Sequence, residues 1–360
     1  MLVPVFESDG EAGGGRQGQG DCIVMDLFQL TRSLIDIESI TRNEGPAGEF
    51  LMEQLAPLVS RHGGALERMD VEEGRFNVLA FWGEPRVTFS THMDTVPPHI
   101  PSSEDGQRIW GRGACDAKGI IAGMIHAAAG LLEEGARGIA LLFVVGEEKN
   151  SAGAREAARH PRGSRYLING EPTENKLALG SKGALRFEIT ASGKMAHSAY
   201  PELGESAIDK LLDVLQDVRS LPLPSDPVLG PGSLNIGTIA GGRAPNVIPD
   251  SASAELMFRL VGEAGPLRKA VYDAARGRAV AREVLCIPPL RLGAVEGFDS
   301  TVVAFTTDIP EFGGAWGEPF LVGPGSIHVA HTSEEHIEKR QLLEAVQVYQ
   351  ALARRLLAGG

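Results

Sequence analysis

The feature of this sequence that most constrains its fold is an alternation of short apolar stretches with stretches of helical length. In chain order, the pattern predicts strands and helices as follows: a strand at 77–82, a strand at 87–91, a helix at 117–134, a strand at 138–145, a helix at 152–159 and a strand at 166–168. Strands that alternate with helices are typical of α/β layer structures. We therefore expect an α/β fold with a mixed, mostly parallel sheet and helices on both of its faces.

Further helical patterns stand on either side of this region. They predict helices at 27–37, 47–62 and 339–357. By contrast, residues 1–22 are glycine-rich and polar, and such a stretch buries too little apolar surface to offset its ordering entropy. We predict a disordered tail at 1–22 and a folded part from about Met25, which is also a candidate for the natural start of the protein.

Beyond Gly183 the pattern changes to stretches of period two, which predict half-buried strands. These stretches and two further helices lie at 185–191, 233–240, 251–260, 205–221 and 265–276. The combination is typical of a separate α+β module. We predict an inserted second domain at 183–288, between two parts of a first domain at 23–182 and 289–360.

Composition narrows the class of function. The chain carries 34 Lys and Arg against 47 Asp and Glu, a formal net charge of -13, and has no basic run. This balance argues against a nucleic-acid partner and against binding to anionic lipid, so a small-molecule substrate is the better expectation. The three cysteines, Cys22, Cys115 and Cys286, lie far apart and fit a reducing compartment. No apolar run approaches the ~18 residues that cross a bilayer and no signal peptide is evident, so we expect a cytoplasmic protein.

Residues that commonly bind metal ions follow three of the predicted strands. His92 and Asp94 follow the first, Glu147 and Glu148 the second, and Glu171 the third. Ligand sites in open parallel sheets form just beyond the carboxyl ends of the strands, so these side chains should meet at one rim of the sheet. Each motif alone is also consistent with a solvated turn or helix start.

Two more segments carry candidate ligands. Asp116 lies in a glycine-bearing loop immediately before a predicted helix, where an ordinary N-cap would be the simpler explanation if it stood alone. Far downstream, the segment after Gly325 contains three histidines, of which at most one or two could serve a single site: His328, His331 and His336.

Taken together, these motifs place histidines and carboxylates at the same rim of one sheet. Mixed sets of this kind suit zinc, cobalt or manganese, and a pair of ions about 3.5–4 Å apart needs one carboxylate to bridge them. Asp116, with a short side chain on a fixed loop, is the natural bridge. The chain contains no Gly-x-Ser-x-Gly elbow and no cysteine in a suitable setting, so covalent catalysis has no candidate nucleophile.

The motifs resemble those of the metalloaminoacylase family, which includes acetylornithine deacetylase, succinyl-diaminopimelate desuccinylase, aminoacylase and bacterial glutamate carboxypeptidase. Five motifs stand in the family's order, with similar spacing, from about Met25 to the C-terminus. The resemblance implies two divalent metal ions per subunit, zinc by preference with cobalt or manganese as substitutes. It also implies that the inserted module is a lid or dimerisation domain and that the protein is a homodimer.

The resemblance also assigns roles in the metal site. The implied metal ligands are His92, Asp116, Glu148, Glu171 and His331, with Asp116 bridging the two ions. Asp94 would orient His92, as second carboxylates commonly do for metal-bound imidazoles. Glu147 would be the general base. His331 is favoured over the two neighbouring histidines because the family ligand follows a Gly-Pro-Gly loop and precedes a Thr-x-Glu-Glu segment.

In the inserted module, the resemblance implies contacts with the substrate. His197 would reach the active site of the partner subunit and stabilise the oxyanion, although alanine replaces the usual glycine at 196. Asn246 and Arg259 would hold the substrate's carboxylate, for which a planar guanidinium is suited. Gly325, in the Gly-Pro-Gly loop, is a further predicted contact. Without the resemblance, His197 and Arg259 would be read as surface residues.

The implied activity is hydrolysis of an amide whose amine side is an amino acid with a free carboxylate. A bound divalent ion lowers the pKa of water from 15.7 toward ~7, so Glu147 could accept a proton near neutral pH and return it to the leaving amine. We expect a deacylase similar to those acting on acetylornithine, acetylcitrulline or acyl-lysine. A dipeptidase or carboxypeptidase is the alternative, and a non-catalytic binding protein on the same scaffold is a third possibility.

Overall fold

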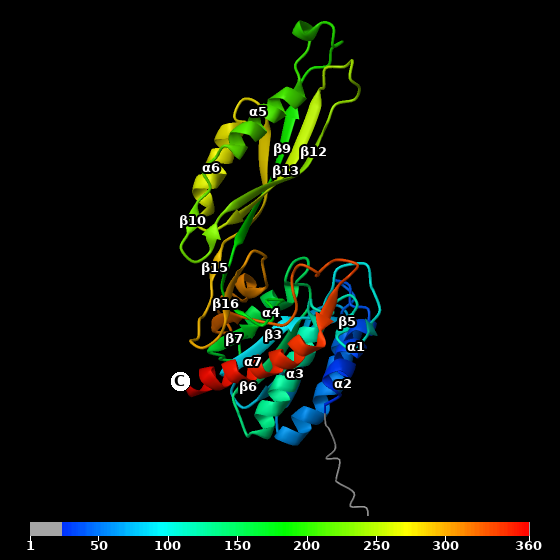
Figure 1. Cartoon of the computed structure of the whole chain (residues 1–360), viewed down its shortest axis with the longest axis vertical. Helices are drawn as coiled ribbons and strands as arrows, with labels where there is room; N and C mark the ends of the chain where they lie inside the picture. The colour runs from blue at the N-terminus through cyan, green and yellow to red at the C-terminus, as the bar shows by residue number, and fades with distance from the viewer. Residues whose placement is uncertain (1–23, 360) are drawn as a thin grey trace, which may run out of the picture.

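The computed structural model describes residues 24–359, so the predicted tail at 1–22 lies outside the described residues. The described chain forms a broad α/β body and a slender second part that extends away from it (Figure 1). The helices and strands predicted for the body occur in the predicted order, with further short strands between them.

A nine-stranded sheet forms the centre of the body. Its strands, in spatial order, are β1 (Ala65–Glu72), β2 (Arg75–Trp82), β6 (Ile139–Val144), β3 (Val87–His92), β7 (Tyr166–Asn169), β17 (Glu318–Leu321), β8 (Leu177–Ser181) and β15 (Leu290–Arg291), with β16 (Ser300–Val303) also paired to β8. The four central strands β6, β3, β7 and β17 run parallel. Antiparallel pairs lie on both sides of them. The prediction of a mixed sheet with a parallel centre is confirmed.

Helices cover both faces of this sheet because the buried strands alternate their side chains between two apolar layers. In β6, Leu141 and Phe143 pack in one layer, whereas Leu142 and Val144 pack in the other. The first layer contains α1 (Leu27–Asp36), α2 (Gly45–His62), α3 (Lys118–Glu133) and α7 (Lys339–Ala358). The second contains α4 (Ala152–Arg159) and the short helix η2 (Ile309–Phe312). Successive side chains of a strand point to opposite faces of the sheet, and here helices cover both faces. Side chains on both faces are therefore buried, which is why these strands appear in the sequence as continuous apolar runs.

The slender part is a four-stranded antiparallel sheet with two helices. Its strand order is β12 (Ser233–Gly241), β13 (Ser251–Leu260), β9 (Gly183–Ser192) and β14 (Val280–Ile287). The helices α5 (Ala207–Arg219) and α6 (Ala264–Ala275) pack on the face that carries Leu185, Phe187 and Phe258. All of these elements fall within the range predicted for the insertion. We call this part the lid.

Short elements complete the chain. They are β4 (Ser103–Glu104), β5 (Arg108–Trp110) and β18 (His336–Glu338), which form a small sheet, the pair β10 (Ser225–Asp226) and β11 (Gly230–Pro231), and the short helix η1 (Pro201–Leu203). The sheet of β4, β5 and β18 joins residues far apart in sequence, since His336 pairs with Trp110. Between residues 24 and 359, no helix combines the length and apolarity needed to cross a bilayer.

Candidate active site

The ends of three neighbouring parallel strands build the site. β6, β3 and β7 lie side by side, so their carboxyl ends meet at one rim of the sheet. His92 is the last residue of β3, Glu147 and Glu148 follow β6, and Glu171 follows β7. Since ligands of open α/β sheets bind at this rim, the topology places these side chains where the sequence predicts them.

Asp116 reaches the same rim from the loop between β5 and α3. The buried carboxylate of Glu335 holds this loop by accepting hydrogen bonds from the backbone N–H of Gly113 at 2.9 Å and from Nη1 of Arg112 at 2.5 Å. The carbonyl of Glu335 also accepts the N–H of Gly111 at 3.0 Å. Glu335 lies four residues after His331, so one residue ties together the two loops that carry Asp116 and His331.

These residues form two groups that could each hold a metal ion. The first is His92, Asp116 and Glu171, and the second is Asp116, Glu148 and His331. Within each group, the potential ligand atoms all lie within 4.8 Å of one another. One carboxylate oxygen of Asp116 is 3.0 Å from Nε2 of His92, and the other is 3.2 Å from Nε2 of His331. Asp116 therefore lies between the two groups, as a bridging ligand would.

The charge balance of the site also favours bound cations. Burial, reinforced by the charge of Glu171, raises the pKa of Glu147 well above its usual range. Burial likewise raises the pKa of Glu171, with the charge of Asp116 as the next cause. Hydrogen bonds to Asp116 and Glu148 raise the pKa of His331 to about 10. Because several buried carboxylates need compensating positive charge, a mixed imidazole and carboxylate set of this kind fits divalent ions such as zinc.

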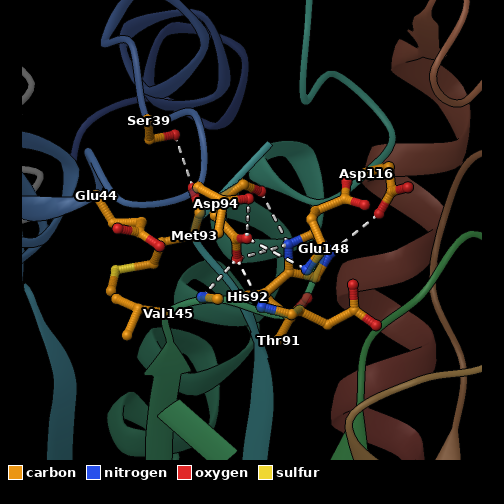
Figure 2. A network of polar contacts seen from close by, with 12 residues as sticks. Ser39, Glu44, Thr91, His92, Met93, Asp94, Asp116, Val145 and Glu148 are labelled. Carbon is orange, nitrogen blue, oxygen red and sulfur yellow. Dashed lines mark hydrogen bonds and ion pairs between the residues drawn. The ribbon is translucent and has the colours of Figure 1, made fainter. Parts of the chain in front are cut away.

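Asp94 is the centre of a hydrogen-bond network behind the site (Figure 2). Its Oδ1 accepts the backbone N–H of Gly146 at 2.9 Å and of Glu147 at 3.0 Å, and its Oδ2 accepts the N–H of Glu148 at 3.2 Å. Gly146 makes this convergence possible with a φ of 84°, which favours glycine. The hydroxyl of Thr41 donates to Oδ2 at 2.8 Å. Asp94 thus positions the segment that carries Glu147 and Glu148.

Comparisons with known proteins agree with this geometry. Residues 88–355 match the model of peptidase family M20/M25/M40. The chain is 37% identical over 338 residues to a peptidase M20 domain-containing protein of Schizosaccharomyces pombe, with 91% of this chain and 84% of that protein covered. It is 39% identical over 371 residues to a probable carboxypeptidase of Aspergillus oryzae, with 91% and 86% covered.

The chain belongs to peptidase family M20/M25/M40.

Two solved structures share the fold of this M20 family member. Aminopeptidase PepT from Bacillus cereus aligns with a TM-score of 0.76 at 18% identity, covering 92% of this chain and 98% of that one. An M20 family metallo-carboxypeptidase from Sulfolobus solfataricus aligns with a TM-score of 0.69 at 17% identity, covering 91% and 98%. The resemblance stated from the sequence motifs is therefore confirmed. This M20 peptidase is a metal-dependent hydrolase of amide bonds.

A cavity of about 460 Å³ opens onto the metal-type residues of this M20 peptidase. Glu147 lies in its wall, and among the described residues no side chain or backbone donor bonds to the Glu147 carboxylate. Glu147 is also absent from both ligand groups. Glu147 therefore lines the cavity without belonging to either set of potential metal ligands.

Arg259 lines the same cavity from the end of β13. It is half-buried, and none of its guanidinium nitrogen atoms has a hydrogen-bond or ion-pair partner anywhere in residues 24–359. A half-buried guanidinium without a partner, facing a cavity, is suited to bind an anionic group of a ligand.

Not every residue singled out from the sequence lies at this cavity. The loops that contain His197 and Asn246, at 193–206 and 242–250, lie at the end of the lid farthest from the body (Figure 1), and both residues are exposed. Gly325 uses its N–H to bond Gln341 and its carbonyl to accept from Glu174, so neither group is free.

The other two late histidines differ from His331. His328 and His336 belong to neither ligand group, and Nδ1 of His336 contacts the carbonyl of Glu334 at 2.7 Å. His331 also has a φ of 65°, a conformation that is uncommon for residues other than glycine. Such backbone conformations cluster at functional sites.

The motif analysis did not identify the residues that hold the site from behind. Thr41 and Ser39 lie on the segment between α1 and α2, and Ser39 donates to the carbonyl of Met93 at 2.7 Å. Asp308 precedes η2 and is buried, and burial raises its pKa to about 7. None of these residues stands in a recognisable motif, because their role depends on contacts between distant segments.

Proposed function

We propose that this M20 peptidase hydrolyses the amide bond between an acyl group and the nitrogen of an amino acid that keeps a free carboxylate. The observation that carries the proposal is the unpaired guanidinium of Arg259 in the same cavity as Glu147 and the two ligand groups. A substrate carboxylate at Arg259 would hold the neighbouring amide near the metal-type residues. Positioning of this kind contributes a large part of enzymatic rate enhancement.

The roles of the individual side chains follow from their surroundings. His92, Asp116, Glu148, Glu171 and His331 would hold two divalent ions, for which we propose zinc, with cobalt or manganese as substitutes. When bound, these ions supply the Lewis acidity that makes a water reactive at neutral pH. Glu147 accepts a proton as that water attacks the amide carbonyl and donates it to the leaving nitrogen. Burial raises the pKa of Glu147, which makes its carboxylate a stronger base for the first of these transfers.

Two kinds of acyl group are candidates. The Glu171-Pro-Thr motif resembles that of deacylases, which supports a small acyl group such as acetyl on ornithine, citrulline or lysine. The names of the similar fungal proteins, probable carboxypeptidases, support an aminoacyl or peptidyl group instead. Both candidates share the carboxylate that Arg259 would bind, so they differ only on the acyl side of the bond.

We also propose that the protein works as a homodimer. His197 and Asn246 are exposed on the lid and do not line the cavity of their own chain. In a dimer formed through the lid, these residues could reach the cavity of the partner subunit. The negative formal charge supports a small-molecule substrate. The free cysteines Cys115 and Cys286 support a location in the reducing cytosol.

An activity panel tests the proposal. The protein, loaded in turn with zinc, cobalt and manganese, is assayed against N-acetyl amino acids, N-succinyl amino acids and dipeptides. We expect hydrolysis of compounds with a free carboxylate, reversible loss on chelation, and no hydrolysis of the matching amino acid amides. Full activity after complete removal of metal, or equal rates on acids and amides, would refute the proposal.

A further inference from the structure

A second cavity adjoins the first at Arg259. It has a volume of about 490 Å³ and is separated from the first cavity by residues that line both, namely Arg259, Phe305 and Ile327. Its walls come from the segment after Glu171, from β16 and the residues that follow it, and from the loop before His331. No residue that the two ligand groups contain lines this second cavity.

We propose that this second cavity binds the side chain of the amino acid that bears the free carboxylate. The assignment rests on the proposed function and on the geometry of a tetrahedral carbon. In the proposed substrate, the α-carbon is bonded to the amide nitrogen, which points to Glu147 in the first cavity, and to the carboxylate, which binds Arg259. The side chain leaves the same carbon in a third direction, and the space open on the other side of Arg259 is the second cavity.

The lining of the second cavity selects the kind of side chain. Val302, Phe305 and Ile327 offer apolar surface. Two of the hydroxyl groups already bond to the protein, since Thr173 donates to the carbonyl of Lys176 at 2.7 Å and Ser326 accepts the N–H of His328 at 3.4 Å. Burying apolar surface there favours large side chains over small ones.

The charges around the cavity disfavour acidic side chains. Within residues 24–359, Arg259 is the only Lys or Arg that lines it, and the proposed carboxylate occupies that guanidinium. Glu174 also lines the cavity and pairs with Lys176 at 3.0 Å. An acidic side chain would therefore enter without a cation of its own and next to a carboxylate. The geometry thus points to substrates whose carboxyl-terminal residue is large and not acidic, such as leucine, methionine or phenylalanine.

A substrate series measures this preference. The metal-loaded enzyme is assayed on compounds that share the best acyl group of the activity panel and end in glycine, alanine, leucine, phenylalanine, aspartate or glutamate. We expect kcat/KM for leucine and phenylalanine to exceed that for alanine by about tenfold or more, and acidic residues to be the poorest. A preference for glycine or for acidic residues would overturn the assignment.

Two variants test whether the side-chain preference arises in this second cavity. Ala304 lines the cavity at an exposed position, so Ala304→Trp should occupy the space and lower the leucine to alanine ratio of kcat/KM by about tenfold. Val302→Arg adds a cation to the half-buried wall and should raise the glutamate to leucine ratio by about tenfold. A gain on glutamate cannot arise from misfolding. Ala56→Trp, on the exposed face of α2, is the control for adding a tryptophan.

The outcomes separate this assignment from the proposed function. If the wild-type enzyme hydrolyses the series but neither variant changes the ratios, the second cavity does not bind the side chain, and the proposed function stands. If the metal-loaded enzyme hydrolyses no compound with a free carboxylate, the proposed function fails and the assignment fails with it.

Discussion

At the scale of single residues, Asp94 is a buried carboxylate of the site that belongs to neither group of potential metal ligands. Its contacts show what it does instead. Nδ1 of His92 lies 2.9 Å from the carbonyl oxygen of Asp94 and 3.6 Å from its carboxylate. The carboxylate instead accepts bonds from Thr41 and from the backbone of residues 146–148. Hydrogen bonds to a charged group contribute about 1.5–3 kcal/mol each, so this arrangement fixes Glu147 and Glu148 firmly.

Glu147→Gln tests the separation of proton transfer from metal binding. The glutamine keeps the size of the side chain but cannot carry a proton, so we expect kcat to fall by about 10²–10⁴-fold. Metal content, measured by elemental analysis, and the melting temperature should stay near wild type because Glu147 lies in neither ligand group. Loss of metal, or turnover close to that of the wild type, would contradict the role assigned to Glu147.

His331→Ala tests the composition of the second ligand group. Removing one of the three side chains of that group should lower the metal content of purified protein from about two ions per subunit toward one. His328→Ala and His336→Ala are matched controls on the same loop and should keep both ions. Equal metal content in all three variants would show that His331 is not a ligand.

At the scale of elements, the loop between β5 and α3 depends on a buried ion pair. Arg112 and Glu335 are 2% and 1% exposed, so their pairing is not weakened by solvent as it would be at the surface. The pair joins this loop to the segment before β18, and the antiparallel pairing of β18 with β5 continues the contact. Two loops that are far apart in sequence thereby present Asp116 and His331 to each other at 3.2 Å.

Glu335→Gln should therefore damage both stability and metal binding. The substitution leaves Arg112 charged and buried without its partner, which typically costs about 3–5 kcal/mol of unfolding free energy. We also expect weaker binding of the ion shared by Asp116 and His331, measured by titration with a chelator at a temperature where the variant is folded. Glu334→Gln, at the exposed neighbouring position, is the control and should change neither quantity. Wild-type stability in Glu335→Gln would refute the structural role of this pair.

At the scale of the whole molecule, the lid extends away from the body and carries His197 at its far end, within the segment 193–206 (Figure 1). Two exposed apolar side chains lie on this segment, Tyr200 at 58% and Leu203 at 59%, and Ile239 of β12 is also 58% exposed. Apolar side chains gathered on an exposed edge are typical of surfaces that another protein covers. A second copy of the lid would bury them and bring His197 toward the partner's cavity.

Mixing two inactive variants tests this arrangement. We expect His197→Ala and Glu147→Ala to be nearly inactive when each is assayed alone. The two variant proteins are then dissociated into subunits, mixed and allowed to reassociate. In a mixed dimer, one site has Glu147 and receives His197 from the other subunit. Random pairing makes about half of the dimers mixed, so activity should recover to about a quarter of wild type.

The control is the same treatment applied to each variant alone, which should restore nothing. Formation of mixed dimers is verified by differently tagged subunits. No recovery in proven mixed dimers would mean that His197 acts within its own chain or has no role in catalysis.

The sequence by itself determined the order and type of the main elements, because their signals are local. The apolar runs at 77–82 and 138–145 predict β2 and β6, and the predicted helix at 152–159 matches α4. β1 was not predicted because Ala65–Glu72 is a polar edge strand with one buried residue, and such a strand forms through its pairing with β2. The family was also evident from the sequence, since its motifs each lie within a few neighbouring residues.

Only the tertiary structure decided how these motifs are held and what surrounds them. Thr41 bonds Asp94 across 53 positions, and Arg112 bonds Glu335 across 223, and no local pattern encodes such pairs. The same holds for the cavities, because Arg259, Phe305 and Ile327 come from three separate segments and adjoin only after β9, β13 and the body are in place. The sequence determines which side chains are present and what chemistry they can perform, whereas the distances between these side chains depend on how the whole chain packs.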